Sequence, residues 1–383
     1  MKKLFALALV AAMMLSCVSA LAADPVYDAF SGYLMGSGRE AKLYKPTEFI
    51  ETKAANMLYE KLYYFTVYGL AGQEDPAVIA HWASLGLTKK VYDADDADHM
   101  WSVFVPTGHE FGEDYKFPVV FCLHGNQNDI MLAETYGFAE LGGREGFITI
   151  CPWASNGDIL IEEIPRILDT VRGEYSIDES RIYVTGFSKG GVSTLNAIIN
   201  YPELFAAAAP GGIGPLGKNG DGIGDERDNT PCEPDSQLYW AFDQEKFDAL
   251  GAAVMPICFF GGTADSMPIA TPEVNYWITV SGAVAPEMTP ELLENVARNS
   301  AYGVERMTGL QYQTLGQMEV RHYDEQNYYI GSYYNEDGVC TFRLVAVEGA
   351  PHWLMPSEAE VVWEFLSQFA RDPETHELIY LNK

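Results

Sequence analysis

The sequence predicts an α/β protein in which helices cover both faces of a mostly parallel central sheet, preceded by an N-terminal extension. Two observations support this fold class. From about His99 onward, short apolar runs alternate with amphipathic stretches, and this alternation is typical of a parallel sheet. Residues 117–123 and 147–152 are almost continuously apolar, as expected for strands that are buried on both faces.

The individual elements follow from these patterns in chain order. Apolar residues at helical spacing predict a helix over 161–175, where Pro165 is compatible only with a position near the helix start. A strand over 181–187 leads into a helix that begins near Lys189 and stops at Pro202. We expect further strands at 205–212, 255–262 and 339–347, a hairpin turn at 337–338, and a last helix at 357–370.

A secretory signal peptide is expected at the N-terminus. Lys2 and Lys3 precede a short apolar run that ends in small residues, which predicts cleavage near Ala22 and secretion of the protein. A membrane anchor is disfavoured because the run is short and lacks a basic far flank. Lipid attachment at Cys17 is less favoured than secretion, because Met14 does not fit that motif.

The charge balance limits the partners that this protein would bind. The chain has 54 acidic and 24 basic residues, and its formal net charge is −30. Such a surface repels nucleic acids and anionic membranes, so neither is expected as a partner. No later segment is apolar over a length that would span a bilayer.

The cysteines predict buried thiols and no metal centre. The chain has six cysteines, and loss of Cys17 with the signal peptide would leave an odd number. Cys122, Cys151 and Cys258 lie in apolar strand-like runs, where a buried free thiol is expected. The sequence has no CxxC motif and no Cys/His cluster, so a zinc site is not expected.

A glycine-rich turn around Ser188 is the clearest sign of chemistry. Residues 186–190 match the G-x-S-x-G pattern, with a predicted strand before the turn and a predicted helix after it. Glycines permit a tight turn, and the N-terminus of the following helix favours developing negative charge. The pattern predicts that Ser188 is a nucleophile.

Asp265 and His352 are the expected partners of Ser188, since each follows a predicted buried strand. Histidine is suited to act as a general base near neutral pH, and a carboxylate can hold the histidine in the required tautomer. The chain order Ser188, Asp265, His352 is that of α/β-hydrolases and differs from the orders of the serine proteases on other folds. We therefore expect an acyl-enzyme mechanism that needs no cofactor.

Backbone N–H groups are expected to form an oxyanion hole. In hydrolases of this architecture, one donor comes from the loop after an early strand and the other from the residue after the nucleophile. These donors would belong to Asn126 and Lys189. His124 ends the preceding strand, and we interpret it as a structural residue that holds this loop.

The chain also resembles the secreted esterase family of polyhydroxybutyrate depolymerases, feruloyl esterases and acetylxylan esterases. The segments that carry the resemblance are 123–125, 180–191, 201–210, 261–265 and 349–366. The resemblance covers about residues 100–370 and implies that Ser188, Asp265 and His352 form the catalytic triad. Gly261 stands where the family has histidine, and the sequence around His352 also departs from the family pattern, so the substrate stays open.

The resemblance implies a serine esterase acting on polysaccharide-linked feruloyl or acetyl esters or on a polyester such as polyhydroxybutyrate. A prolyl-oligopeptidase-like peptidase is an alternative, but the N-terminal region is too short for the large extra domain usual in such enzymes. A non-catalytic binding protein on a hydrolase scaffold is the alternative from another class. The expected organisation is a signal peptide at 1–22, an extension of unclear fold at 23–98 and an α/β-hydrolase catalytic domain at 99–383.

Two segments have a structural and a functional interpretation. Residues 275–334 are rich in aromatic side chains, which either pack in the fold or form part of a lid that stacks on an aromatic acyl group or a sugar. Residues 217–231 form either a solvated acidic loop or a structural calcium site, since acidic residues alternate there with glycines. The candidate calcium ligands are Asn219, Asp221, Asp225 and Asp228.

Overall fold

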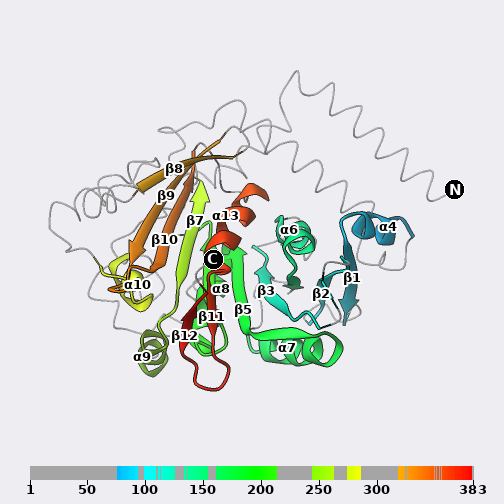
Figure 1. Cartoon of the computed structure of the whole chain (residues 1–383), viewed down its shortest axis with the longest axis horizontal. Coiled ribbons are helices and arrows are strands. Elements are labelled where there is room, and N and C mark those ends of the chain that lie inside the picture. Colours follow the sequence, from blue (N-terminus) through cyan, green and yellow to red (C-terminus); the bar gives the residue numbers. More distant parts are fainter. Residues whose placement is uncertain are drawn as a thin grey trace, which may run out of the picture.

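A ten-stranded sheet forms the centre of the part of the chain that the structure, a computed structural model, describes (Figure 1). The described residues are 76–93, 99–108, 111–112, 114–125, 133–134, 136–153, 161–213, 244–262, 274–285, 318–323, 326–348, 350, 352, 354 and 356–381. The strands are β1 (Leu87–Tyr92), β2 (Trp101–Pro106), β3 (Phe117–Leu123), β4 (Ile148–Pro152), β5 (Ile177–Phe187), β6 (Ala207–Gly211), β7 (Ile257–Gly262), β8 (Met318–Tyr323), β9 (Gln326–Tyr334) and β10 (Cys340–Val347).

The middle of this sheet is parallel and its two edges are antiparallel. The strand order is β1-β2-β4-β3-β5-β6-β7-β10-β9-β8. Strands β4, β3, β5, β6, β7 and β10 pair in parallel, whereas β1 and β2 at one edge and β9 and β8 at the other pair antiparallel. The carboxyl ends of the parallel strands therefore meet along one edge of the sheet, where ligand sites of open α/β sheets form.

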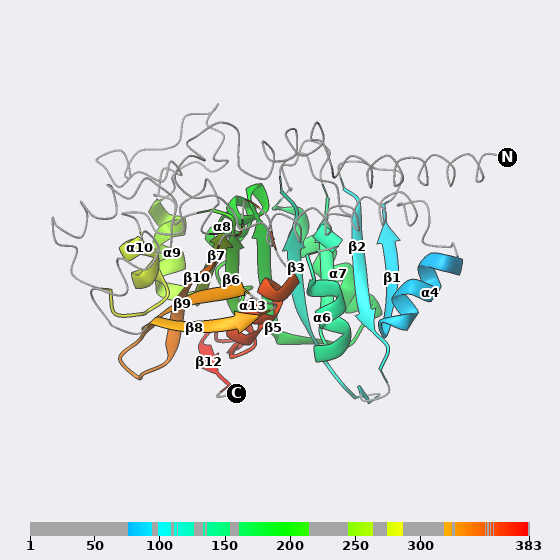
Figure 2. The ribbon, with the colours of Figure 1, turned by 90° about the horizontal axis from the view of Figure 1, so that it is seen from above.

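Helices cover both faces of the sheet, as Figure 2 shows. One face packs against α7 (Glu163–Glu174), α8 (Lys189–Asn200), α9 (Gln244–Ala253) and α10 (Val274–Val280). The other face packs against α4 (Pro76–Ser84), α6 (Phe138–Glu145) and α13 (Pro356–Leu366). The α/β-hydrolase fold predicted from the sequence is thereby confirmed, and none of the described helices is long and apolar enough to cross a membrane.

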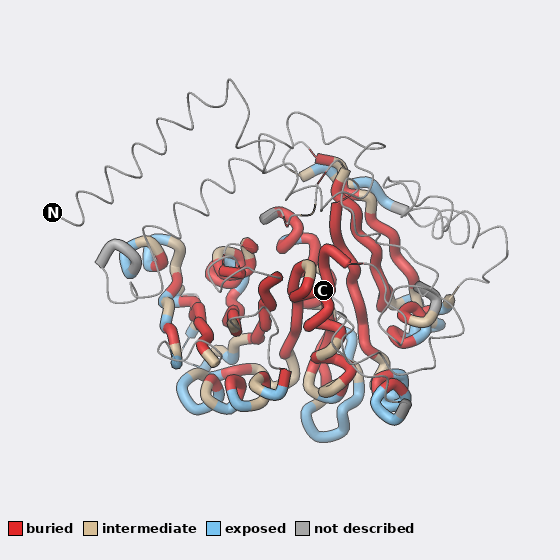
Figure 3. Tube along the Cα trace, turned by 180° about the vertical axis from the view of Figure 1, so that it is seen from behind, coloured by how far each residue is buried: buried red, intermediate tan, exposed pale blue. Residues whose placement is uncertain are grey.

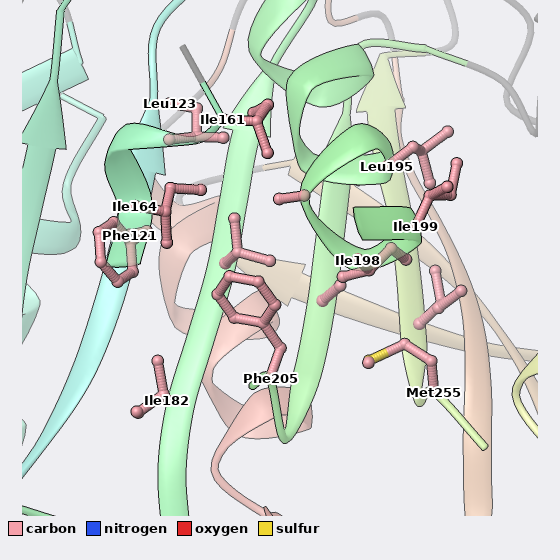
Figure 4. Packing of buried hydrophobic residues seen from close by; sticks show 14 of the residues in the cluster. Phe121, Leu123, Ile161, Ile164, Ile182, Leu195, Ile198, Ile199, Phe205 and Met255 are labelled. Carbon is pink, nitrogen blue, oxygen red and sulfur yellow. The ribbon is translucent and has the colours of Figure 1, made fainter. Parts of the chain in front are cut away.

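Two hydrophobic clusters lie on opposite faces of the sheet, and the middle strands between them are largely buried, whereas the edge strands are partly exposed (Figure 3). In β3, Phe121 and Leu123 belong to the cluster beneath α7 and α8, whereas Val120 and Cys122 belong to the other. Figure 4 shows the first cluster, in which side chains of α8 pack over residues such as Phe205. Burial of each such side chain contributes about 1.5–3 kcal/mol to folding.

The sheet extends beyond the expected boundary at residue 99. β1 pairs with β2, so residues 87–92 belong to the same sheet as the rest of the main domain. The sequence of β1 hides this role because Lys89 points inward, where its ammonium group contacts the buried carboxylate of Glu134 at 2.7 Å. The predicted hairpin turn is confirmed, since β9 and β10 are joined by a turn in which Gly338 has φ of 78°.

The last helix ends earlier than predicted. We expected a helix to residue 370, but α13 ends at Leu366, and residues 369–371 form β11 (Phe369–Arg371), which pairs with β12 (Leu378–Tyr380). The hydrophobic pattern continues past the helix because the side chain of Phe369 is also buried. The helical and the extended segment thus share an apolar pattern, so this pattern does not mark the end of the helix.

Candidate active site

The turn between β5 and α8 holds Ser188 in a conformation that non-glycine residues rarely adopt. Its φ is 59° and its ψ is −120°, and its backbone N–H donates to the carbonyl of Gly211 at 2.8 Å. A residue in such a region costs on the order of 1–3 kcal/mol unless its surroundings hold it there. A side chain at Gly190 would overlap the backbone of Leu123 on β3, so this position needs glycine.

The structure brings Ser188 and His352 together. Nε2 of His352 lies 2.8 Å from Oγ of Ser188, and both side chains are partly buried. Ser188 follows β5 and His352 follows β10, and the carboxyl ends of these parallel strands lie at the same edge of the sheet. In the tautomer that carries its proton on Nδ1, the imidazole accepts the hydroxyl proton, which is the arrangement that activates a serine nucleophile.

An aromatic group lies beneath the imidazole of His352. The ring centroid of Phe187 is 5.0 Å from that of His352, and the two planes are inclined at 44°. Tyr136 and Phe260 also pack near Phe187, each with its ring centroid 6.4 Å from that of Phe187. Sequence reasoning missed these residues. The only signal for Phe187 was its place as the variable residue before the serine in the G-x-S-x-G pattern.

His124 is buried at the carboxyl end of β3, where its Nδ1 donates to the carbonyl of Gly125 at 2.8 Å. Burial, together with the nearby charge of Lys189, lowers the pKa of this imidazole from 6.5 to about 4, although the hydrogen bond to Gly125 acts in the opposite direction. His124 is therefore neutral near pH 7 and holds the start of the loop that follows β3. Lys189 is the first residue of α8, and N–H groups in the first turn of a helix have no carbonyl partner within the helix.

Several predicted site residues lie outside the described part of the chain. They are Asp265 of the expected triad, Asn126 of the expected oxyanion hole, and the calcium candidates Asn219, Asp221, Asp225 and Asp228. Within the described ranges, no cluster of histidine, cysteine, aspartate and glutamate has the composition of a metal site. The geometry therefore describes the nucleophile and the base of the expected triad but not its acid.

The described part of the aromatic segment 275–334 packs within the fold. Trp277 on α10 is buried in the core, and Tyr276 lies against it with a ring-centroid distance of 5.3 Å. On β9, Tyr328 and Tyr333 are also fully buried. Residues 286–317 lie outside the described residues, and the hypothesis of a lid is confined to them.

The expected buried thiols are confirmed for Cys122, Cys151 and Cys258. Cys340 is also a free, buried cysteine, whereas Cys232 lies outside the described residues. Burial raises the pKa of the Cys258 thiol to about 12 and also raises that of Cys151. Thiols in this state are poor nucleophiles.

Curated relatives match a limited part of the chain. A segment of 116 residues is 33% identical to poly(3-hydroxyalkanoate) depolymerase C of Paucimonas lemoignei and covers 26% of this chain and 28% of that protein. A segment of 102 residues is 31% identical to the bifunctional acetylxylan esterase/xylanase XynS20E of Neocallimastix patriciarum and covers 24% of this chain and 15% of that protein. The expected resemblance to this esterase group is confirmed, although the match spans less than a third of either relative. No protein-family model matches the chain.

The comparison with solved structures finds esterases at low sequence identity and low TM-score. An acetyl xylan esterase from Aspergillus awamori is 15% identical over 73% of this chain and 98% of that chain, with a TM-score of 0.42. The feruloyl esterase module from Clostridium thermocellum, solved as an S954A mutant with sinapinate, is 13% identical over 72% of this chain and 84% of that chain, with a TM-score of 0.39. At these scores the assignment of the fold depends on the strand order described above.

Proposed function

We propose that this protein is a secreted serine esterase that cleaves carboxylic esters through an acyl-enzyme. The observation that carries the proposal is the contact of 2.8 Å between Oγ of Ser188 and Nε2 of His352 at a strained turn that opens a helix. The names of the sequence relatives, a polyester depolymerase and acetylxylan esterases, support ester hydrolysis as the reaction class.

In the proposed mechanism, Ser188 attacks the acyl carbon of the ester while His352 takes the hydroxyl proton. Asp265 would hold His352 in the tautomer that this step requires. The backbone N–H groups of Asn126 and Lys189 would stabilise the negative charge on the carbonyl oxygen. His352 then protonates the leaving alcohol, and water, activated by the same imidazole, releases the acid from the serine.

The substrate class that we propose is an ester attached to a polysaccharide or a polyester such as polyhydroxybutyrate. Relatives of both kinds match the chain, and neither match extends over the whole protein. A panel of feruloyl, acetyl, butyryl and hydroxybutyryl esters would separate the two classes. A peptidase would instead cleave prolyl anilides, and a binding protein would bind a polymer without turning over any of these compounds.

Substitutions at the triad test the mechanism. Ser188→Ala and His352→Ala should each lower kcat on the best ester by a factor on the order of 10⁴–10⁶, and Asp265→Asn should lower it somewhat less. Intact-mass analysis after reaction with a fluorophosphonate should show one adduct on the wild-type protein and none on the Ser188→Ala variant. Near-normal turnover by Ser188→Ala would contradict the assignment of the nucleophile.

Secretion follows from the N-terminal sequence pattern, which supports cleavage near Ala22. We expect N-terminal sequencing of the exported protein to begin close to residue 23. A mature protein that keeps Lys2 and Lys3, or that carries a lipid on Cys17, would contradict this proposal.

A structural calcium ion in the loop 217–231 is a separate proposal that depends on the alternation of acidic residues with glycines there. A bound ion would stabilise the folded state by mass action, so the Tm should rise in millimolar calcium and fall in chelator. Paired Asp221→Asn and Asp225→Asn substitutions should abolish that response without affecting kcat. An identical Tm in calcium and in chelator would rule out the ion.

A further inference from the structure

The ring of Phe187 packs against the imidazole of His352. The two rings are 5.0 Å apart between centroids, and Phe187 is only 4% exposed. Phe187 is also the residue immediately before Ser188, at the end of β5. The side chain that packs against His352 and the expected nucleophile therefore belong to consecutive residues, Phe187 and Ser188.

The ring of Phe187 has little freedom of its own. A Cβ added at Gly212 would lie 2.6 Å from the ring, so the backbone at Gly212 leaves no space on that side. The ring of Tyr136 packs near that of Phe187 at an interplanar angle of 67°, and the ring of Phe260 packs at 45°. Close packing of this kind holds side chains in single rotamers. The group formed by Tyr136, Phe187 and Phe260 is therefore a rigid support.

We propose that Phe187 is a positioning residue that keeps the imidazole of His352 aligned with the hydroxyl of Ser188. This inference rests on the proposed serine-hydrolase function of the same site. His352 lies on a segment after β10, and without the ring of Phe187 packed against it a partly buried imidazole would sample other χ1 and χ2 values. Loss of the contact between Nε2 and Oγ would lower the rate of proton transfer and leave substrate contacts unchanged.

The test compares Phe187→Ala and Phe187→Leu with a matched control, Phe259→Leu. Phe259 is fully buried and directly precedes Phe260 on β7. It belongs to the hydrophobic cluster on the opposite face of the sheet and contacts Trp277 and Phe342. For hydrolysis of p-nitrophenyl acetate we expect kcat to fall about 10–100-fold in Phe187→Ala, with KM within about threefold of wild type. Phe187→Leu should recover part of the loss, and Phe259→Leu should keep kcat near the wild-type value.

A second measurement does not depend on the natural substrate. The rate at which a fluorophosphonate modifies Ser188, followed by intact mass on protein shown to be folded by circular dichroism, should fall in parallel with kcat. If Phe187→Ala does not fold, the partial loss in Phe187→Leu carries the test. Wild-type rates in the folded Phe187 variants, or equal losses in Phe259→Leu, would overturn the inference. A wild-type protein that is neither modified at Ser188 nor active would overturn the proposed function itself.

Discussion

The two edges of the parallel sheet use polar groups in opposite ways. At the carboxyl edge, Ser188 has a strained backbone and its partly buried hydroxyl contacts His352. At the amino edge, the buried guanidinium of Arg371 donates to the carbonyls of Phe205, Ala253, Val254 and His376 at 2.7–3.1 Å. At the carboxyl edge the hydroxyl of Ser188 is only partly buried, whereas at the amino edge each of these four carbonyls accepts a hydrogen bond from the guanidinium.

Arg371 ties the C-terminal hairpin to the segments that lead into β6 and β7. Phe205 precedes β6, and Ala253 and Val254 precede β7, so one side chain joins three separate stretches of chain. Burial lowers the pKa of its guanidinium to about 10, and charge-assisted hydrogen bonds offset part of this desolvation cost. The comparison teaches that the contacts of Arg371 and the proposed catalytic contact lie at opposite edges of one sheet.

The largest effect that would sharpen this comparison is expected from Arg371→Met. Removal of the guanidinium leaves buried carbonyls without donors, so the free energy of unfolding should fall by about 3–5 kcal/mol. Urea denaturation measures this loss, and kcat of the protein that remains folded should be close to wild type. Arg144→Met is the control, because Arg144 pairs with Glu360 on the surface and its loss should change stability by less than about 0.5 kcal/mol. Equal effects of both variants would contradict the role of Arg371.

An intermediate effect is expected from pH at the carboxyl edge. The pKa of His124 is lowered from 6.5 to about 4, so the unfolded chain binds a proton there more readily than the folded protein. This contribution to stability is complete above about pH 6.5 and is lost as pH falls toward 4, by about 3 kcal/mol in total.

The variant His124→Asn isolates this contribution, since its side-chain amide can still donate to the carbonyl of Gly125 but does not titrate. Unfolding free energies measured between pH 4 and pH 7 should show a shallower loss for the variant than for wild type. The same slope in both proteins would show that His124 does not hold its imidazole neutral.

The smallest effect is expected from the strained backbone of Ser188 in the turn between β5 and α8. Ser188→Gly and Ser188→Ala both remove the nucleophile, but only glycine adopts a φ of 59° with a ψ of −120° without strain. The glycine variant should be more stable than the alanine variant by about 1 kcal/mol. Within α8 the order should reverse, with Ser193→Gly less stable than Ser193→Ala by about 1 kcal/mol. Thermal melts of the four proteins measure these differences. A higher Tm for Ser188→Ala than for Ser188→Gly would show that the backbone at position 188 is not strained.

Sequence patterns sufficed for the parallel part of the sheet because its strands contain long runs of mainly apolar residues that are buried on both faces. The same reasoning placed Ser188 and His352 at strand ends on one edge, since parallel strands order their carboxyl ends together. It failed for β1, where Lys89 points inward and finds its partner Glu134 only in the folded protein. It also missed Phe187, because a contact with His352 joins residues far apart in the chain.

The central sheet also separates the interior into two compartments. Phe259 and Phe260 are neighbours in sequence but belong to hydrophobic clusters on opposite faces of β7. Substitutions that share no partners have additive effects on stability, and this sheet keeps the partners of the two residues apart. An engineer could therefore repack the layer beneath α8 for thermostability while leaving untouched the layer that supports the base.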